Sequence, residues 1–248
     1  MLVCIWIVIF CIGVLKEREN ETDTDAKSFI SSIEYAANES TVFNNEQKSF
    51  DNESESIDKV SDDFDNGWNL TLVNKWHPLP EKLEIETVEL SNGECVDKRI
   101  YPYLQKMFDD ARAEGIYPIV RSGYRTRTEQ EDIYNDRIQG YQADGMSAEE
   151  AKTETELWVA VPGTSEHELG LAVDINADKV HSEGAQVYAW LENHAHLYGF
   201  INRYPPDKTE ITGVANEPWH YRYVGVEAAS EIHERGICLE EYLENDGN

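Results

Sequence analysis

The feature that most constrains how this chain folds is an abrupt change in amino-acid composition near residue 67. Residues 16–66 carry 15 acidic and 5 basic side chains among many Asn, Ser and Thr residues. Such a stretch buries too little apolar surface to offset the entropy lost on ordering it. After it, apolar and aromatic residues arrive quickly from Trp68 onward. We therefore predict a disordered acidic linker over 16–66 and a folded domain over 67–248, with an acidic surface helix around 29–37 as the alternative within the linker.

The first 15 residues, 1–15, are apolar or nearly so, and the charged run Lys16–Glu19 follows at once. As a helix, this segment would span roughly 22 Å, which is short of the ~30 Å hydrocarbon core of a bilayer. No basic segment precedes it. We expect a signal or membrane-anchor segment. The folded domain is then extracytoplasmic, and it is either membrane-anchored or secreted.

The charge and cysteine content exclude several functional classes. The 248 residues include 21 Lys and Arg against 49 Asp and Glu, a formal net charge of −28, so nucleic acid is not an expected partner. The 40% of hydrophobic residues is enough for a core. Four Cys residues without a Cys-x-x-Cys pair provide neither a disulfide scaffold nor a zinc finger. Any metal must therefore be held mainly by His and carboxylate groups.

Periodic patterns in the folded part predict helices mixed with short strands. We expect strands over 116–121, 170–175 and 219–224. We expect helices over 100–111, 128–138 and 185–198, and two more that begin near 147 and 226. Two helix starts have capping-box spacing, Thr128 with Glu131 and Ser147 with Glu150. The strands are too scattered for a regular βαβ series, so the predicted class is α+β.

The expected strand over 170–175 has one face of large apolar side chains and one face of small or acidic residues. Leu171, Val173 and Ile175 alternate with Gly170, Ala172 and Asp174. The alternation sends the large residues into the core and leaves Asp174 room for a ligand.

Two histidines are candidates to join this aspartate. His167 lies shortly upstream, where a loop can fold its imidazole back beside Asp174. His220 lies near the start of the expected strand over 219–224, with Glu217 three positions before it. Two His and one Asp would form a three-ligand zinc site with one open position. For His220 alone, a hydrogen-bonded core histidine is the alternative.

Three motifs resemble the VanY-like D-alanyl-D-alanine carboxypeptidases. Residues Ser165–Asp174 match the pattern Ser-x-His-x-x-Gly-x-Ala-x-Asp, and Glu217–His220 match Glu-x-x-His. Residues Ser122–Arg125 resemble the family's Ser-Gly-Tyr-Arg segment, with Gln130 downstream. The resemblance covers roughly residues 68–245 in the right order. It implies a hedgehog-like DD-peptidase fold, in which helices flank a central antiparallel sheet.

The resemblance also implies the chemistry and the residues that perform it. The family consists of zinc peptidases that act on peptidoglycan stem peptides in the cell wall. By motif position, His167, Asp174 and His220 are the zinc ligands, and Glu217 is the general base. Arg125 is expected to polarise the scissile carbonyl or to hold substrate. A monomer is expected.

Four further residues are expected to bind substrate. The resemblance places Gln130 and Ser165 near the terminal carboxylate. Tyr124 and Trp219 are candidates to line the cleft, with a core position as the alternative. Family grounds favour a D,D-carboxypeptidase that removes the last D-Ala. An L,D-carboxypeptidase acting on tetrapeptide stems and a non-catalytic zinc-stabilised cell-wall binding module remain alternatives.

The sequence also allows predictions for some residues outside the motifs. The stretch 137–161 is where an entrance to the cleft could be shaped. Glu166 and Glu168 flank a ligand histidine and are expected to be exposed loop carboxylates, with acceptance of a hydrogen bond from that histidine as the alternative. Cys95 and Cys238 could pair in an exported domain, or remain free.

Overall fold

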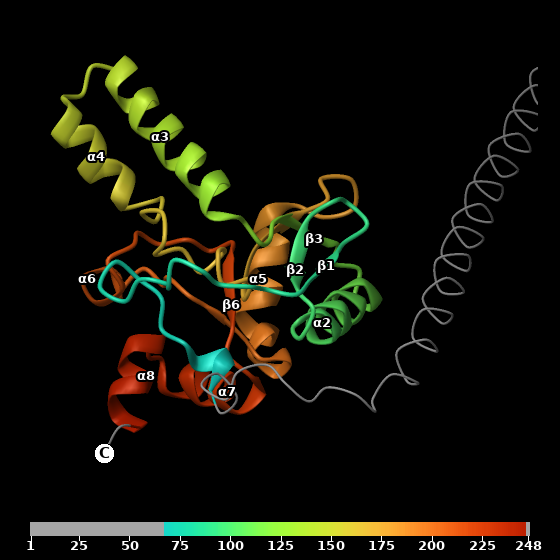
Figure 1. Ribbon diagram of the computed structural model, residues 1–248. Helices are drawn as coiled ribbons and strands as arrows, with labels where there is room; N and C mark the ends of the chain where they lie inside the picture. Colours follow the sequence, from blue (N-terminus) through green and yellow to red (C-terminus); the bar gives the residue numbers. More distant parts are fainter. Residues whose placement is uncertain (1–66, 247–248) are drawn as a thin grey trace, which may run out of the picture. The chain divides into compact units, whose positions relative to one another are not determined.

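The structure is a computed structural model that describes residues 67–246. The predicted anchor over 1–15 and the predicted linker over 16–66 lie outside the described residues. The described part contains a four-stranded sheet, a two-stranded ribbon and the helices around them (Figure 1). The predicted α+β class, with an antiparallel sheet flanked by helices, is confirmed.

The four-stranded sheet is antiparallel, with strand order β3-β4-β6-β5. Its strands are β3 (Pro118–Ser122), β4 (Ala172–Ala177), β5 (Phe200–Asn202) and β6 (His220–Tyr223). The separate antiparallel ribbon consists of β1 (Thr87–Glu89) and β2 (Cys95–Asp97). The two inner strands of the sheet, β4 and β6, are neighbours in space although they are far apart in the sequence. This pairing brings distant motifs together.

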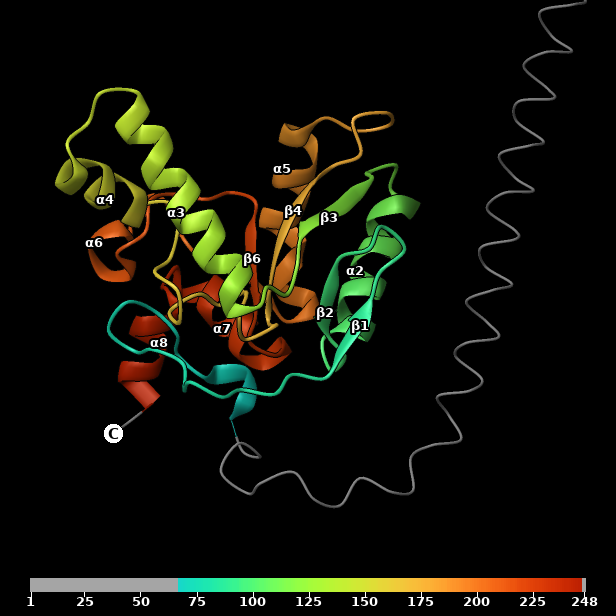
Figure 2. The same cartoon turned by 45° about the horizontal axis from the view of Figure 1, so that its top comes forward.

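Helices surround the sheet, and one pair projects from it. The helices outside that pair are α2 (Tyr101–Ala113), α5 (Gly184–His194), α6 (Thr209–Thr212), α7 (Val226–Arg235) and α8 (Leu239–Asp246), together with the short 3₁₀ helices η1 (Trp68–Leu70) and η2 (Ala195–Tyr198). Of these, α2, α5, α7 and η2 pack against strands of the sheet. The pair itself, α3 (Arg127–Ala143) and α4 (Ala148–Glu156), forms a hairpin that extends away from the sheet (Figures 1 and 2). Within residues 67–246, every helix is too short or too polar to cross a bilayer.

Strand β4 runs through the centre of the core. Leu171, Val173 and Ile175 are all 0% exposed, as their alternation predicts. Ala172 is also buried, because the opposite face of the sheet is covered as well. On that opposite face Asp174 keeps partial exposure. The strand therefore presents the Asp174 carboxylate to a cavity while its apolar side chains are buried.

The predicted capping box at Thr128 and Glu131 is wrong. Helix α3 begins at Arg127, and Thr126 is its N-cap. The Thr126 hydroxyl accepts from the Glu129 backbone N–H, and the Glu129 carboxylate accepts from the Thr126 backbone N–H. Both pairs have the same spacing, but Thr126 is the last residue in extended conformation, so the first pair caps the helix.

Three other helix boundaries follow from local chemistry. The capping box predicted at Ser147 and Glu150 is confirmed. The helix predicted over 185–198 divides into α5 and the 3₁₀ helix η2, and it ends at Gly199 with φ +86°. The terminal helix is interrupted at Gly236, where φ is +61°, and continues as α8 after that turn. Left-handed glycines end helices without the cost that a Cβ would bring.

Candidate active site

Backbone pairing places the candidate aspartate directly beside one candidate histidine. Asp174 on β4 lies opposite His220 on β6 in the antiparallel register. On its other side, Asp174 lies opposite Ser122 at the end of β3. Directly opposed residues on one face of an antiparallel pair have Cβ atoms about 5 Å apart. The sheet therefore fixes the relative position of Asp174 and His220 before any side-chain contact is made.

A tight loop folds His167 back onto this pair. The His167 carbonyl accepts from the backbone N–H groups of Arg125 and Gly170, each at 3.1 Å. Gly170 has φ +74°, and a Cβ added there would lie 3.0 Å from Ile85 Cγ2. Only glycine suits both the conformation and the space. The glycine in the motif is thus a requirement of the turn that carries the histidine.

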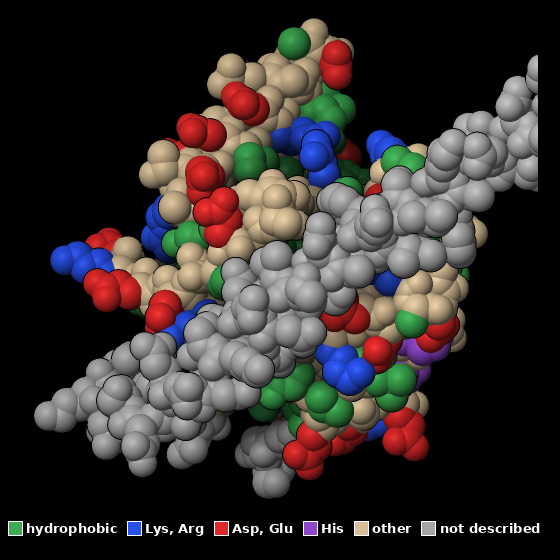
Figure 3. Space-filling model, turned by 90° about the vertical axis from the view of Figure 1, so that its right-hand side faces the viewer, with side chains coloured by type: hydrophobic (Ala, Val, Ile, Leu, Met, Phe, Trp, Pro, Cys, Tyr) green, Lys and Arg blue, Asp and Glu red, His purple; other side chains and the backbone are tan. Residues whose placement is uncertain are grey.

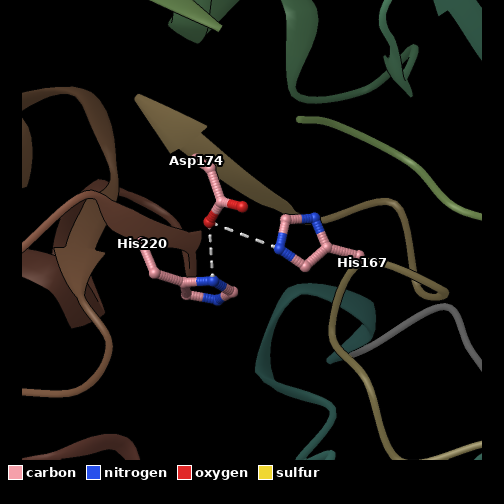
Figure 4. A group of neighbouring side chains, drawn as sticks. All are labelled: His167, Asp174 and His220. Carbon is pink, nitrogen blue, oxygen red and sulfur yellow. Dashed lines mark hydrogen bonds and ion pairs between the residues drawn. The ribbon is translucent and has the colours of Figure 1, made fainter. Parts of the chain in front are cut away.

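The three side chains point toward a common centre (Figure 4). Asp174 Oδ1 lies 3.1 Å from His220 Nδ1 and 3.4 Å from His167 Nε2. The three candidate ligand atoms all lie within 4.8 Å of one another. Two neutral imidazoles and one carboxylate are a donor set that zinc accepts, with a fourth position left open. The residues present therefore fit a zinc ion.

The two imidazoles present different nitrogens to the centre. His167 Nδ1 lies 2.7 Å from the carbonyl oxygen of Gly123, to which it donates, so its Nε2 lone pair faces Asp174. His220 faces Asp174 with Nδ1 instead. Burial lowers the pKa of His167, which favours the neutral form that a metal needs. Burial alone would raise the pKa of Asp174, but both imidazoles hold it well below its usual value.

Glu217 lies beside the three ligand candidates without joining them. Its Oε2 is 3.8 Å from His220 Nδ1. Its backbone is fixed: the N–H donates to the Tyr204 carbonyl at 3.1 Å, and the carbonyl accepts from Asn202 Nδ2 at 3.0 Å. Burial raises the pKa of Glu217 to about 7, and the Asp174 charge adds to the rise, while His220 and Arg125 oppose it. A carboxylate with that pKa can exchange protons near neutral pH.

Arg125 is held by three side chains and brings a positive charge to the centre. Its Nε donates to Ser122 Oγ at 2.9 Å, and its Nη1 donates to Gln130 Oε1 at 3.0 Å. Its Nη2 lies 3.1 Å from Asp174 Oδ2. Gln130 is itself buried, and its Nε2 donates to the carbonyl of Ala160 at 2.8 Å. This chain of contacts orients the guanidinium.

A cavity of about 420 Å³ opens over these groups. The predicted site residues that line it are Arg125, Gln130, Ser165, His167, Asp174, Glu217, Trp219 and His220. Its walls also include residues from the stretch in which an entrance was expected, namely Arg137, Tyr141, Trp158, Val159 and Ala160. Tyr124 is not part of this lining. A larger cavity of about 520 Å³ contains none of the predicted site residues.

Two residues beside His167 differ from expectation. Glu166 and Glu168 are buried, 1% and 6% exposed, so the expectation of exposed loop carboxylates is wrong. Glu168 accepts from the backbone N–H of Gly163 and from Arg127. Glu166 accepts from two buried arginines, Arg203 and Arg222. Ion pairing compensates the cost of burying each carboxylate.

Sequence reasoning also missed Tyr204, whose ring centroid lies 4.8 Å from that of His220. It belongs to the Pro-rich loop, where no periodicity marks a buried side chain, so only its place before two prolines could have signalled it. Cys95 and Cys238 are both free, so the alternative in which they pair is wrong.

The comparisons with known proteins agree with the motifs. The sequence profile of the VanY family, D-alanyl-D-alanine carboxypeptidase, matches residues 93–226. The D-alanyl-D-alanine carboxypeptidase of Enterococcus faecalis is 60% identical over 179 residues, which cover 72% of this chain and 67% of that protein.

Two solved structures share the fold. One is a zinc complex of a mutant vancomycin resistance D,D-pentapeptidase VanY, with 60% identity and a TM-score of 0.70 over 71% of this chain and 99% of that chain. The other is VanYB in complex with D-alanine-D-alanine, with the same identity and TM-score over 71% of this chain and 98% of that one. The hedgehog-like fold implied by the motifs is thereby confirmed, and the chain belongs to the VanY family of D-alanyl-D-alanine carboxypeptidases.

Proposed function

We propose that this protein is a zinc-dependent D,D-carboxypeptidase that removes the C-terminal D-Ala from peptidoglycan stem peptides. The observation that carries the proposal is the convergence of His167 Nε2, Asp174 Oδ1 and His220 Nδ1 beside Glu217. The zinc complex and the D-alanine-D-alanine complex of the 60% identical relatives support the cofactor and the substrate class.

In this proposal His167, Asp174 and His220 hold the zinc, which when bound acts as a Lewis acid that polarises the scissile carbonyl and lowers the pKa of water. Glu217 is the general base: a carboxylate oxygen takes a proton from the attacking water and returns it to the leaving amine. Its position supports this role, because Glu217 Oε2 lies 3.8 Å from His220 Nδ1 and faces the same cavity without being one of the candidate ligands.

Arg125 opposes the negative charge that develops on the carbonyl oxygen. A guanidinium held by Ser122 and Gln130 needs no reorganisation when that charge appears. Contact with Asp174 keeps it at the metal site.

Recognition of the terminal carboxylate is assigned to Gln130 and Ser165. The Ser165 hydroxyl oxygen accepts from the His167 backbone N–H at 3.3 Å, which leaves its own O–H to donate. Trp219 lines the cavity and is proposed to contact substrate. For Tyr124 the same proposal has less support, because the residue lies outside the lining.

We also propose an extracytoplasmic location, because peptidoglycan lies outside the cytoplasmic membrane. Anchoring through residues 1–15 is the mechanism that their composition favours, and secretion to the cell wall is the alternative. Nucleic acid is not a proposed partner: on the face shown in Figure 3, the visible Lys and Arg side chains lie in small separate groups among acidic ones. We propose that the protein acts as a monomer.

Mass spectrometry of stem peptides tests the activity directly. Zinc-loaded protein should remove one D-Ala from a pentapeptide stem and leave a tetrapeptide stem intact. Loss of D-Ala from the tetrapeptide instead would establish the L,D-carboxypeptidase. Zinc binding without any release would establish the non-catalytic binding module. Undiminished release by a Glu217→Ala variant would remove Glu217 as the base.

A further inference from the structure

The two oxygens of the Glu166 carboxylate have different surroundings. Oε1 accepts from Arg203 Nε and from Arg222 Nη1, each at 2.8 Å. Oε2 has no hydrogen-bond partner among residues 67–246, although it is buried. The polar atom it faces is His220 Nε2, at 3.5 Å. A buried acceptor without a donor costs about 1–3 kcal/mol, so this oxygen calls for an explanation.

His220 Nε2 is the second buried polar atom of this pair that lacks a hydrogen bond within residues 67–246. It too is buried without a hydrogen-bond partner in the described part of the chain. The other ring nitrogen, Nδ1, faces Asp174 and the candidate metal centre. A neutral imidazole that gives one lone pair to a metal carries its proton on the other nitrogen. A ligating His220 would therefore direct an N–H toward the free oxygen of Glu166.

We propose that Glu166 is a positioning residue of the metal site, whose Oε2 accepts the Nε2 proton of His220 and so keeps Nδ1 aimed at the metal. The inference rests on the proposed ligand set and concerns binding of zinc rather than turnover. Glu166 is not one of the three candidate ligands. It acts through His220.

A buried ion cluster holds Glu166 in this position. Arg203 and Arg222 are both 0% exposed. Arg203 also donates from Nη1 and Nη2 to the Glu240 carboxylate, at 2.8 and 2.6 Å. Arg222 also donates from Nη2 to the backbone carbonyls of Asn69 and Thr71. Since both arginines are fixed by other partners, the Glu166 carboxylate cannot turn away from His220 without losing two charged hydrogen bonds.

The other histidine supports this interpretation. His167 donates from Nδ1 to the Gly123 carbonyl at 2.7 Å, which leaves Nε2 for the metal. Each candidate ligand histidine thus has one acceptor behind it. For His167 the acceptor is a backbone carbonyl, whereas for His220 it is a carboxylate.

A Glu166→Gln variant tests the proposal, with zinc affinity measured by competition with a chromophoric chelator. An amide has a single acceptor oxygen, so it cannot serve both the arginines and His220. We expect zinc affinity to fall about 10- to 100-fold, the usual effect of removing a partner of a metal-bound histidine. In zinc-loaded protein, NMR should show a slowly exchanging His220 Nε2 proton that exchanges faster in the variant.

Two variants provide matched controls. Glu168→Gln removes the other buried carboxylate beside His167, which contacts Gly163 and Arg127 but no ligand candidate. Glu240→Gln changes the charge of the same buried cluster by the same amount without touching His220. Both should bind zinc within about 3-fold of the unmodified protein. If Glu166→Gln does not fold, Glu166→Asp carries the test, because it keeps the charge for the arginines but shortens the reach to His220.

A zinc affinity of the Glu166 variant within about 2-fold of the unmodified protein would overturn the proposal. So would an equal loss in Glu240→Gln, because the effect would then belong to the cluster and not to His220. Failure of the proposed function is distinguishable: it would leave D-Ala unreleased while the differences in zinc affinity persisted.

Discussion

The two sides of the active-site cavity are built in opposite ways. On the sheet side, Asp174 and His220 lie on strands paired through their backbones, and all four residues of β6 are buried. On the other side, helix α3 is 17 residues long but buries only Gln130 and Tyr134, and α4 buries only two small residues. Figure 1 shows this hairpin extending away from the sheet. Strand pairing thus fixes the candidate ligands Asp174 and His220, whereas the hairpin formed by α3 and α4 buries few side chains.

From this difference in packing we expect the two sides to have different roles in metal binding and substrate binding. Chemistry requires ligand atoms placed to within a fraction of an ångström, and paired strands provide that precision. A loosely packed wall can adjust to a peptide. We therefore expect substitutions on the sheet side to change metal binding and kcat, and those on the hairpin to change KM.

The largest effect is expected from Asp174→Ala. Removing the central ligand candidate leaves two imidazoles, so zinc affinity should fall by more than the roughly 100-fold that loss of an outer partner causes. Activity at micromolar zinc should then fall to background. Metal content after dialysis, measured by atomic emission, checks this. Full zinc occupancy in the variant would remove Asp174 from the ligand set.

A Glu217→Gln variant should distinguish a role in proton transfer from a role in zinc binding. The amide cannot accept a proton, so kcat should fall about 10²- to 10⁴-fold while zinc affinity stays within a few-fold. Steady-state kinetics alongside chelator competition measures both quantities. A loss of zinc as severe as that in Asp174→Ala would make Glu217 a ligand instead.

The same variant should be more stable than the unmodified protein when metal is removed. Burial raises the pKa of Glu217 from 4.5 to about 7, so the folded state binds more protons than the unfolded state between these values. Folding stability therefore falls as pH rises through this window and stays reduced above it. At pH 8, Glu217→Gln should gain roughly 2–3 kcal/mol in free energy of unfolding, with little gain at pH 4. Denaturant titrations at both pH values check the sign, and an equal gain at pH 4 would contradict this origin.

On the hairpin side, Tyr141→Ala should act on binding. Tyr141 lines the cavity from α3 and is not one of the candidate ligands. We expect KM to rise about 10-fold, the equivalent of about 1.4 kcal/mol, with kcat within 2-fold. Asn135→Ala, on the same helix but outside the cavity lining, is the control and should change neither. An equal fall in kcat would mean that the hairpin helps to place the catalytic groups.

The smallest effect is expected from Thr126→Ala at the start of the hairpin. Loss of the capping box should lower the free energy of unfolding by about 1 kcal/mol. Because the cap lies directly after Arg125, which is proposed to stabilise the transition state, a small fall in kcat should accompany it. A Ser147→Ala variant, which removes the corresponding cap of α4, provides the comparison. Thermal unfolding of both variants measures the caps, and no change in either would contradict the cap geometry.

Local patterns could single out candidates for the metal site, because Asp174 and His167 each lie in a segment with a local signal. The alternation around Asp174 and the glycine turn after His167 are visible within a few residues. A loop could be expected to bring His167 beside Asp174, but the placement of His220 depended on the resemblance, since no local pattern predicts that β4 pairs with β6. The misplaced cap at Thr128 shows the limit of spacing alone, because Thr126 offered the same spacing.

The burial of Glu166 could not be predicted from the residues next to it in the sequence. Its partners Arg203 and Arg222 lie 37 and 56 residues away, and a single Glu in a polar loop is ordinarily exposed. Tyr204 is similar, since it gains its place against His220 from tertiary packing. The side chains missed by sequence reasoning are those that surround the ligands, because their contacts are almost all long-range.

Anomalous diffraction at the zinc edge on crystals of the zinc-loaded protein tests the central claim most directly. We predict one strong peak about 2.0–2.2 Å from His167 Nε2, Asp174 Oδ1 and His220 Nδ1, with Glu217 outside bonding distance. A peak bound by other side chains, or none at this place in fully loaded protein, would contradict the account.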